Sequence, residues 1–158
     1  MLALRGRLSP AAESGGTSLK RTSSAHWSGN LQNGSGTLTT ASGVLSTTPY
    51  SFHSRFEQGQ GTNPEELLAA AHAGCFTMAL SNILAQAGLT ADSLDTKCTI
   101  SLEKDGAGFS ITGSHLELEA KVPNATAEAF ENAVQTAKNN CPVSKLFDTE
   151  ITLNARLV

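Results

Sequence analysis

The stretch "NPEELLAAAHAGCFTMALSNILAQAG", residues 63–88, decides the fold because it predicts one long buried helix. Asn63 can cap the helix start, Pro64 suits the first helical position, and Glu66 is placed to complete a capping box. Gly88 is the residue type that ends helices. Between these ends the segment is apolar nearly all round, which predicts burial on most sides.

The chain has 158 residues, the length of one ordinary domain. A domain of this size cannot easily surround such a helix alone, so we expect the helix to pack against a sheet and a second chain. We expect a single domain over residues 22–158. Residues 1–21 lack apolar periodicity and are rich in Ser, Gly, Ala and Arg, which predicts a disordered tail, a cloning remnant or a weak targeting segment.

The periodicity of the remaining sequence predicts an α+β fold. Alternating apolar residues predict strands, and a helical pattern predicts an amphipathic helix; the expected strands are 95–104, 110–122 and 150–158, and the helix is 125–140.

The region between residues 25 and 56 is expected to form strands and turns. "NGSG" at 33–36 is a hairpin signal, and 49–56 alternates loosely, so we expect Arg55 on a strand beside aromatic residues.

Composition excludes several classes of function. A net charge of −3 gives no basic footprint for nucleic acid or an anionic membrane, and no apolar run is expected to cross a membrane. Three cysteines without a CxxC motif do not describe a disulfide scaffold or a zinc site. We therefore expect a cytoplasmic protein without metal or cofactor, carrying one or two reactive thiols.

The three cysteines have different local contexts. Cys98 is in phase with Ile100 and Leu102, which predicts a small buried hydrophobe. Cys141 precedes a proline at the start of a short helix, "CPVSKLF", where unpaired N–H groups favour a thiolate. Position alone leaves Cys141 equally open to a plain capping role.

Cys75 lies too far along its helix for the dipole to activate it, so a nucleophilic role needs a nearby base or cation. His72, three residues earlier, is one candidate, although a core histidine bonded to a carbonyl is the simpler interpretation. Arg55 is the other candidate, with an exposed surface charge as its alternative. Glu65 lies in the first helical turn with no capping role that we can assign.

These residues lie in motifs that resemble the OsmC/Ohr family of bacterial thiol-dependent peroxidases. The resemblance rests on "RFEQGQGTNPEELLAAAHAGCFTMALS" at 55–81 with "CPVSKLF" at 141–147. "HWSG", "SGVL…PYSF", "GTNPEEL" and "CPVS" resemble the OsmC branch, and the similarity runs from about Ala25 to the C-terminus.

The resemblance implies an intertwined homodimer with curved antiparallel sheets around two long central helices. It also implies that organic hydroperoxides are reduced to alcohols, hydrogen peroxide less efficiently, in oxidative and osmotic stress defence. Cys75 matches the peroxidatic cysteine and Cys141 the resolving cysteine that forms an intramolecular disulfide with it. Arg55 and Glu65 match the arginine and glutamate of the active site, and a dithiol such as dihydrolipoamide is the implied reductant.

Helix geometry adds one expectation about the site. Ten residues separate Glu65 from Cys75, which is about 15 Å of helical rise. Because one arginine cannot easily touch both, we expect a composite site in which the partner subunit supplies Glu65 or Arg55. Two other functions stay open: a Cys75–His72 acyl-transfer or hydrolase enzyme, and a non-enzymatic dimeric small-molecule binder.

Overall fold

The computed structural model describes residues 18–158, so most of the tail expected over 1–21 lies outside the described residues. The described chain forms two three-stranded sheets, one long helix and three shorter helices. In chain order the elements are β1 Ser23–Ser28, β2 Ser35–Thr40, β3 Thr48–Tyr50, α1 Phe52–Phe56, α2 Pro64–Gln86, β4 Ser93–Asp105, β5 Gly108–Lys121, α3 Ala127–Asn140, α4 Pro142–Leu146 and β6 Glu150–Leu157. The α+β class expected from the sequence is confirmed.

The C-terminal sheet has the order β4-β5-β6 and is mixed, whereas the sequence resemblance implied antiparallel sheets. β4 and β5 form a long antiparallel hairpin, and β6 runs parallel to β5. The helices α3 and α4 lie between β5 and β6 in the chain, and such a crossover lets β6 pair in parallel. β5 is therefore the middle strand, held on both sides.

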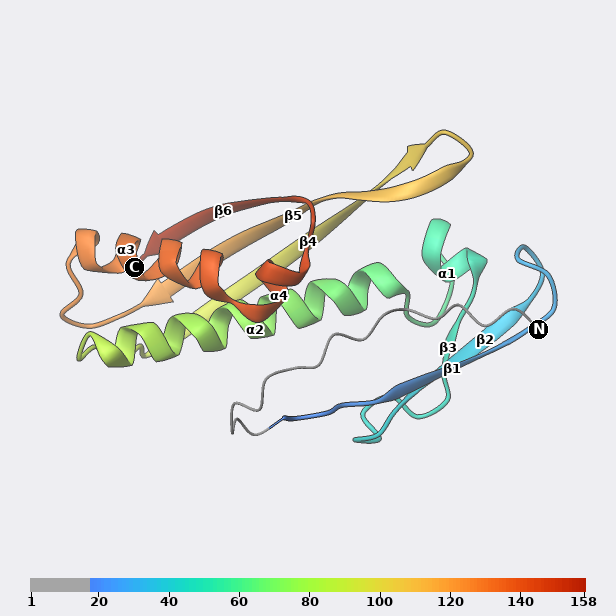
Figure 1. Ribbon diagram of the computed structural model, residues 1–158, viewed down its shortest axis with the longest axis horizontal. Helices are drawn as coiled ribbons and strands as arrows, with labels where there is room; N and C mark the ends of the chain where they lie inside the picture. Colours follow the sequence, from blue (N-terminus) through green and yellow to red (C-terminus); the bar gives the residue numbers. More distant parts are fainter. Residues whose placement is uncertain (1–17) are drawn as a thin grey trace, which may run out of the picture.

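Helix α2 packs one face onto this sheet, with α3 and α4 beside it (Figure 1). Its fully buried residues recur every fourth position, at His72, Phe76, Leu80 and Leu84. This spacing gives a single buried stripe, and it meets the core residues of β5 and α3.

Both ends of α2 follow from the sequence. Asn63 accepts a hydrogen bond from the Glu66 backbone N–H at 2.8 Å, and Gly88 adopts a positive φ of 73° just beyond the last turn. The Glu66 side chain does not complete the expected capping box; it accepts a hydrogen bond from the Thr62 hydroxyl at 3.3 Å.

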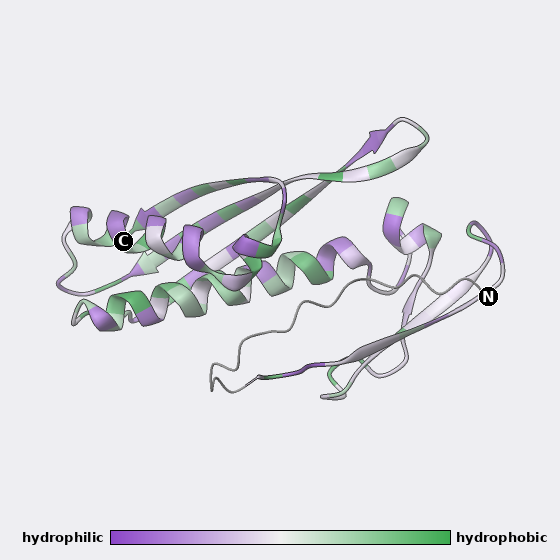
Figure 2. Ribbon diagram, in the orientation of Figure 1, coloured by the Kyte–Doolittle hydropathy of each residue, from purple (hydrophilic) through white to green (hydrophobic). Residues whose placement is uncertain are grey.

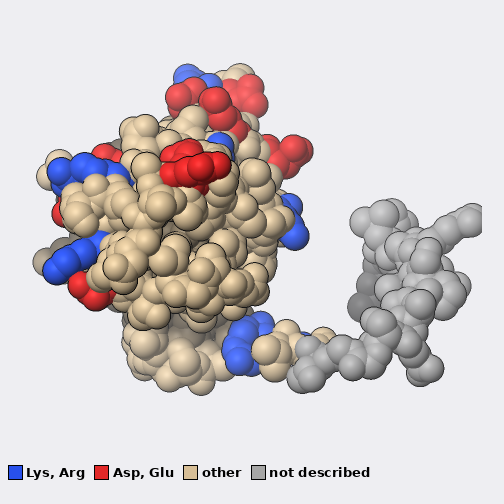
Figure 3. All heavy atoms as spheres, turned by 90° about the vertical axis from the view of Figure 1, so that its left-hand side faces the viewer, with Lys and Arg blue, Asp and Glu red and all other residues tan. Residues whose placement is uncertain are grey.

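Another face of α2 stays exposed in the single chain. Met78 is 77% exposed, and no charged residue occurs between Glu66 and Asp92. Figure 2 shows apolar residues along most of the helix, and Figure 3, facing the end where α2 finishes, shows a broad area without charged side chains. By length and composition α2 could cross a membrane, contrary to our expectation, although core helices of soluble proteins meet the same criterion.

The N-terminal sheet, β1-β2-β3, is antiparallel and lies apart from the C-terminal layers (Figure 1). The hairpin expected at 33–36 is confirmed, since β1 pairs with β2 across it. The strand expected over 49–56 is wrong in its second half, because Phe52–Phe56 form the helix α1. Ser51 and Ser54 cap this helix reciprocally, each side chain accepting the other's backbone N–H at 3.1 and 2.8 Å. Arg55 therefore lies on a helix.

Candidate active site

Cys75 and Cys141 are brought together by the packing of α4 against α2. Cys75 is half-buried in the middle of α2, and Cys141 is fully buried where α3 ends and α4 begins. Cys141 and the Val143 backbone lie close enough to the Cys75 thiol to shift its pKa. Cys141 makes no side-chain capping hydrogen bond, so capping does not explain its presence there.

The surroundings of Cys75 do not by themselves activate it. Burial raises the pKa of the Cys75 thiol, the neighbouring Cys141 raises it further, and the Val143 backbone lowers it. A thiolate is the form that attacks peroxides. A cation near Cys75 would lower this pKa and favour the thiolate.

Arg55 and Glu65 form an ion pair within one chain. Arg55 Nη2 donates to Glu65 Oε1 at 2.7 Å, and Nε donates to both carboxylate oxygens at 3.2 Å. The Glu65 side chain is only 13% exposed and that of Arg55 is 37% exposed. The guanidinium also lies 5.2 Å from the centre of the Phe56 ring. This fork geometry fixes the direction in which the arginine points.

The structure therefore assembles the four residues expected at the site as two pairs. Within residues 18–158, Arg55 and Glu65 are not among the groups that shift the pKa of Cys75. Glu65 lies ten residues before Cys75 on α2, about 15 Å of rise. One chain supplies both members of the Arg55–Glu65 pair. The expected composite site, in which a partner subunit supplies Arg55 or Glu65 to Cys75, stays a prediction.

His72 is a core histidine, as expected, but its partners are hydroxyls and not a carbonyl. Its Nδ1 lies 2.7 Å from Ser114 Oγ and its Nε2 lies 2.9 Å from Ser144 Oγ. Burial lowers the pKa of His72, which keeps the ring neutral. Because both nitrogens are engaged by serines, the ring is not arranged as a base for Cys75, and the acyl-transfer interpretation loses its dyad.

Cys98 packs against the core, as its phase in β4 predicted. Its Sγ also lies 3.3 Å from Ser114 Oγ and 3.9 Å from His72 Nδ1. Burial raises the pKa of Cys98, and the Ser114 hydroxyl opposes that shift. Sequence reasoning missed Ser114 and Ser144; the "CPVS" motif, which contains Ser144, was the one available signal.

An aromatic pocket of about 310 Å³ lies beside Arg55. It is lined by Trp27, Leu31, Tyr50, Ser51, Phe52, Arg55, Phe56 and Pro64. The rings pack on one another, with centroids 5.3 Å apart for Trp27 and Tyr50 and 4.9 Å apart for Phe52 and Phe56. The pocket therefore combines an apolar wall with one cation.

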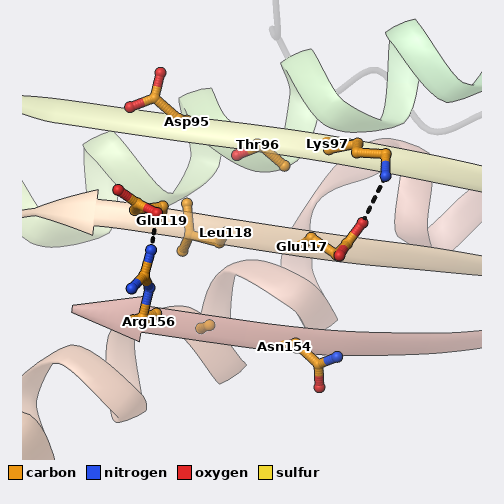
Figure 4. A pocket seen from close by; sticks show the side chains of 9 residues that line it. Asp95, Thr96, Lys97, Glu117, Leu118, Glu119, Asn154 and Arg156 are labelled. Carbon is orange, nitrogen blue, oxygen red and sulfur yellow. Dashed lines mark hydrogen bonds and ion pairs between the residues drawn. The ribbon is translucent and has the colours of Figure 1, made fainter. Parts of the chain in front are cut away.

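A larger hollow, of about 530 Å³, lies on the outer face of the C-terminal sheet (Figure 4). Ion pairs cross it from Lys97 to Glu117 and from Arg156 to Glu119. No cysteine lines it, and four of its five charged side chains pair with one another, Asp95 being the exception, so we interpret it as a solvated sheet face and not as the reactive site. Among residues 18–158, no cluster of His, Cys, Asp and Glu could hold a metal ion.

Comparisons with known proteins agree with this arrangement. The family described as OsmC-like protein matches residues 57–156. Peroxiredoxin OsmC of Escherichia coli (strain K12) is 51% identical over 133 residues, covering 84% of this chain and 93% of that protein. Organic hydroperoxide resistance protein OhrB of Bacillus subtilis (strain 168) is 34% identical over 112 residues, covering 70% and 79%.

Solved structures show the same fold. The crystal structure of OhrB from Bacillus subtilis superposes with a TM-score of 0.61 at 25% identity, covering 87% of this chain and 98% of that one. An OsmC-like protein from Vibrio cholerae superposes with a TM-score of 0.70 at 17% identity, covering 87% and 99%, which supports the fold alone. Relatives named for peroxiredoxin and hydroperoxide resistance activity support a peroxidase-type role. The chain belongs to the OsmC family.

Proposed function

We propose that the protein is a thiol-dependent peroxidase that reduces organic hydroperoxides through Cys75 and Cys141. The observation that carries this proposal is that the two cysteines lie close enough for Cys141 to shift the pKa of Cys75, with Cys75 half-buried on α2 and Cys141 fully buried at the start of α4. A half-buried thiol can be reached by a substrate, whereas a fully buried neighbour is protected from it. The arrangement suits a cysteine that is oxidised first and a second cysteine that resolves it.

The proposed chemistry has two balanced steps. The Cys75 thiolate attacks the terminal oxygen of the hydroperoxide, the O–O bond breaks, and the alkoxide takes a proton to leave as an alcohol. Cys75 is now a sulfenic acid. The Cys141 sulfur attacks the Cys75 sulfur, water leaves, and a disulfide joins the two residues. An external dithiol, such as dihydrolipoamide, then reduces this disulfide.

Among residues 18–158 no cation is among the groups that shift the pKa of Cys75, and the cation that we propose for it is Arg55 of the partner subunit. The Glu65 carboxylate would hold the guanidinium in place, while its positive charge stabilises the thiolate and the leaving oxygen. Arg55 and Glu65 bind each other within the same chain, so both would reach the Cys75 site of the other subunit together. Each active site is thus composite, and a homodimer is the smallest active form.

The surface of α2 supports such a dimer. One stripe of the helix is buried on the sheet, while Met78 on another face is exposed. A second copy of α2 packed on this face would remove the apolar surface from water. It would also complete the pair of central helices that the family resemblance implies. This burial, in place of membrane insertion, agrees with the cytoplasmic location that we propose.

The aromatic pocket beside Arg55 fits the organic part of the substrate. Its lining of rings favours an alkyl or aryl group over water, while Arg55 can direct the peroxide oxygens. Because hydrogen peroxide has no apolar group to place there, we propose that organic hydroperoxides react faster.

Turnover assays test this proposal. The reduced protein is given cumene hydroperoxide or hydrogen peroxide with dihydrolipoamide as the reductant, and peroxide loss is followed. We expect Cys75→Ser to abolish turnover and Cys141→Ser to stop it after one oxidation. Cys98→Ser is the matched control and retains turnover. Equal turnover by Cys141→Ser and wild type would favour a mechanism without a resolving cysteine, and no turnover by wild type would favour a binding protein.

A further inference from the structure

The imidazole of His72 connects three elements of the core. It belongs to α2 and is fully buried. Nδ1 hydrogen-bonds with Ser114 on β5, the middle strand of the C-terminal sheet, at 2.7 Å. Nε2 hydrogen-bonds with Ser144 on α4 at 2.9 Å. Because a neutral imidazole has one donor and one acceptor nitrogen, the two hydroxyls satisfy it completely.

The contact with α4 matters because this helix carries Cys141. Ser144 is the third residue of α4 and lies one turn after Cys141. At the other end of the helix, the Phe147 ring meets the His72 ring edge-on, with centroids 5.0 Å apart. His72 therefore holds α4 at both its first turn and its end.

Helix α4 needs such support. It has five residues, too few for a helix to be stable on its own, and its N-terminal residue offers no side-chain cap. Its exposed side chains include Leu146, which is 76% exposed. Its place against α2 must therefore come from tertiary contacts, and the Ser144–His72 hydrogen bond is buried among them.

We propose that His72 is a positioning residue for the resolving step, holding Cys141 against Cys75 through Ser144. The proposal rests on the proposed function, since it concerns the formation of the Cys75–Cys141 disulfide. Disulfide formation needs a narrow range of Cα separation and dihedral angle. If α4 loosens, Cys141 is aligned for a smaller fraction of the time. The Cys75 sulfenic acid then survives longer, and a second hydroperoxide oxidises it to the sulfinic acid while being reduced to alcohol.

This role differs from that of a catalytic base. Both nitrogens of His72 are engaged by the two serines, so neither is free to take a proton from the Cys75 thiol. Loss of the Ser144 contact should leave the first oxidation of Cys75 unchanged and slow only the second step. A general loss of stability would not separate the two steps in this way.

The test compares two hydrogen bonds made by α2. Ser144→Ala removes the bond to α4. Thr96→Val is the matched control, because it removes the 2.7 Å hydroxyl bond from Thr77 of α2 to β4 and leaves α4 untouched. Reduced full-length proteins are mixed with increasing cumene hydroperoxide. Intact mass, with dimedone trapping of sulfenic acid, then separates thiol, sulfenic acid, disulfide and sulfinic acid.

We expect Ser144→Ala to lose thiol at a rate within about twofold of wild type but to form the disulfide about tenfold more slowly, the effect of one buried hydrogen bond. Sulfinic acid should accumulate at lower hydroperoxide concentration. Thr96→Val should give the same proportions of disulfide and sulfinic acid as wild type. A second pair of variants tests the role if Ser144→Ala misfolds. His72→Gln places an amide where Nε2 lies, near Ser144, whereas the shorter amide of His72→Asn reaches only toward Ser114. We expect His72→Gln to form the disulfide faster than His72→Asn.

The outcomes separate the two proposals. If wild type forms the disulfide, and Ser144→Ala gives the same proportions of disulfide and sulfinic acid as Thr96→Val, the positioning role is wrong and the peroxidase proposal stands. A wild type that keeps both thiols after hydroperoxide treatment overturns the peroxidase, and the positioning role falls with it. Slow disulfide formation in Ser144→Ala, with an unchanged rate of the first oxidation of Cys75, supports both the peroxidase function and the positioning role of His72.

Discussion

Arg55 reaches Glu65 within one chain, with Nη2 2.7 Å from Oε1, while Cys75 lies ten residues further along the helix that carries Glu65. The ion pair joins α1 to the first turn of α2. Glu65 orients the Arg55 guanidinium, and a cation of this kind would lower the raised pKa of Cys75.

Glu65→Gln should lower kcat/KM for cumene hydroperoxide about tenfold or more, since the guanidinium loses its charged anchor. The free energy of unfolding should change by less than about 1 kcal/mol, because partly exposed ion pairs contribute little. Steady-state kinetics and urea unfolding measure the two effects. Glu66→Gln, at the adjacent position, is the control and should keep the activity. Equal losses in both variants would show that the ion pair has no special role.

Mixed dimers should recover activity that neither parent has. Cys75→Ser supplies Arg55, and Arg55→Ala supplies Cys75, so a heterodimer of the two contains one complete composite site. After subunit exchange we expect about a quarter of wild-type activity, because random mixing gives about half heterodimers, each with one working site. No recovery, with exchange verified by mass, would place Arg55 and Cys75 in the same subunit.

Met78→Glu should dissociate the dimer and reduce turnover in parallel. A carboxylate at this position, which is 77% exposed in the single chain, would be buried without a partner in the dimer. Light scattering gives the mass in solution. Val44→Glu is the control, since Val44 is 85% exposed and lies outside α2. A Met78→Glu protein that stays dimeric would move the interface elsewhere.

The stability of the protein should fall as the pH falls below about 6.5. Burial lowers the pKa of His72 in the folded state from its ordinary value of 6.5. The unfolded chain therefore takes up a proton first, so stability is fully present above pH 6.5 and is lost as the pH falls toward the folded pKa. Urea unfolding under reducing conditions, at several pH values, measures this loss.

His72→Asn should flatten the dependence of the unfolding free energy on pH, by at most about 1.4 kcal/mol for each pH unit. His26→Asn removes an exposed imidazole from β1 and should leave the dependence in place. An unchanged dependence in His72→Asn would assign it to another group.

The sequence predicted most of the architecture because the signals were local. Asn63, Pro64 and Gly88 mark the ends of α2, and alternation marks β4, β5 and β6. The helix α1 was missed because two serines cap it, and Ser54 occupies the place where a capping box normally has Glu or Gln. The parallel pairing of β6 was also missed, because the alternation of residues within one strand does not indicate whether the neighbouring strand runs parallel or antiparallel to it.

The site was less accessible from the sequence. Cys75, Cys141, Arg55 and Glu65 were named from the family resemblance, and their grouping into two pairs required the fold. The partners of His72 are 42 and 72 residues away from it in sequence, so no local pattern connects them. Helix α2 was the exception. Its apolar residues on nearly all sides predicted, from the sequence alone, that a single chain leaves one face of the helix exposed.

The most direct test of the account is a titration of the fully reduced protein with one equivalent of cumene hydroperoxide, followed by intact mass and peptide mapping. The account predicts loss of two protons and a linked peptide joining Cys75 to Cys141, with Cys98 still a thiol and a slower reaction for hydrogen peroxide. Three intact thiols, or a disulfide that includes Cys98, would contradict it.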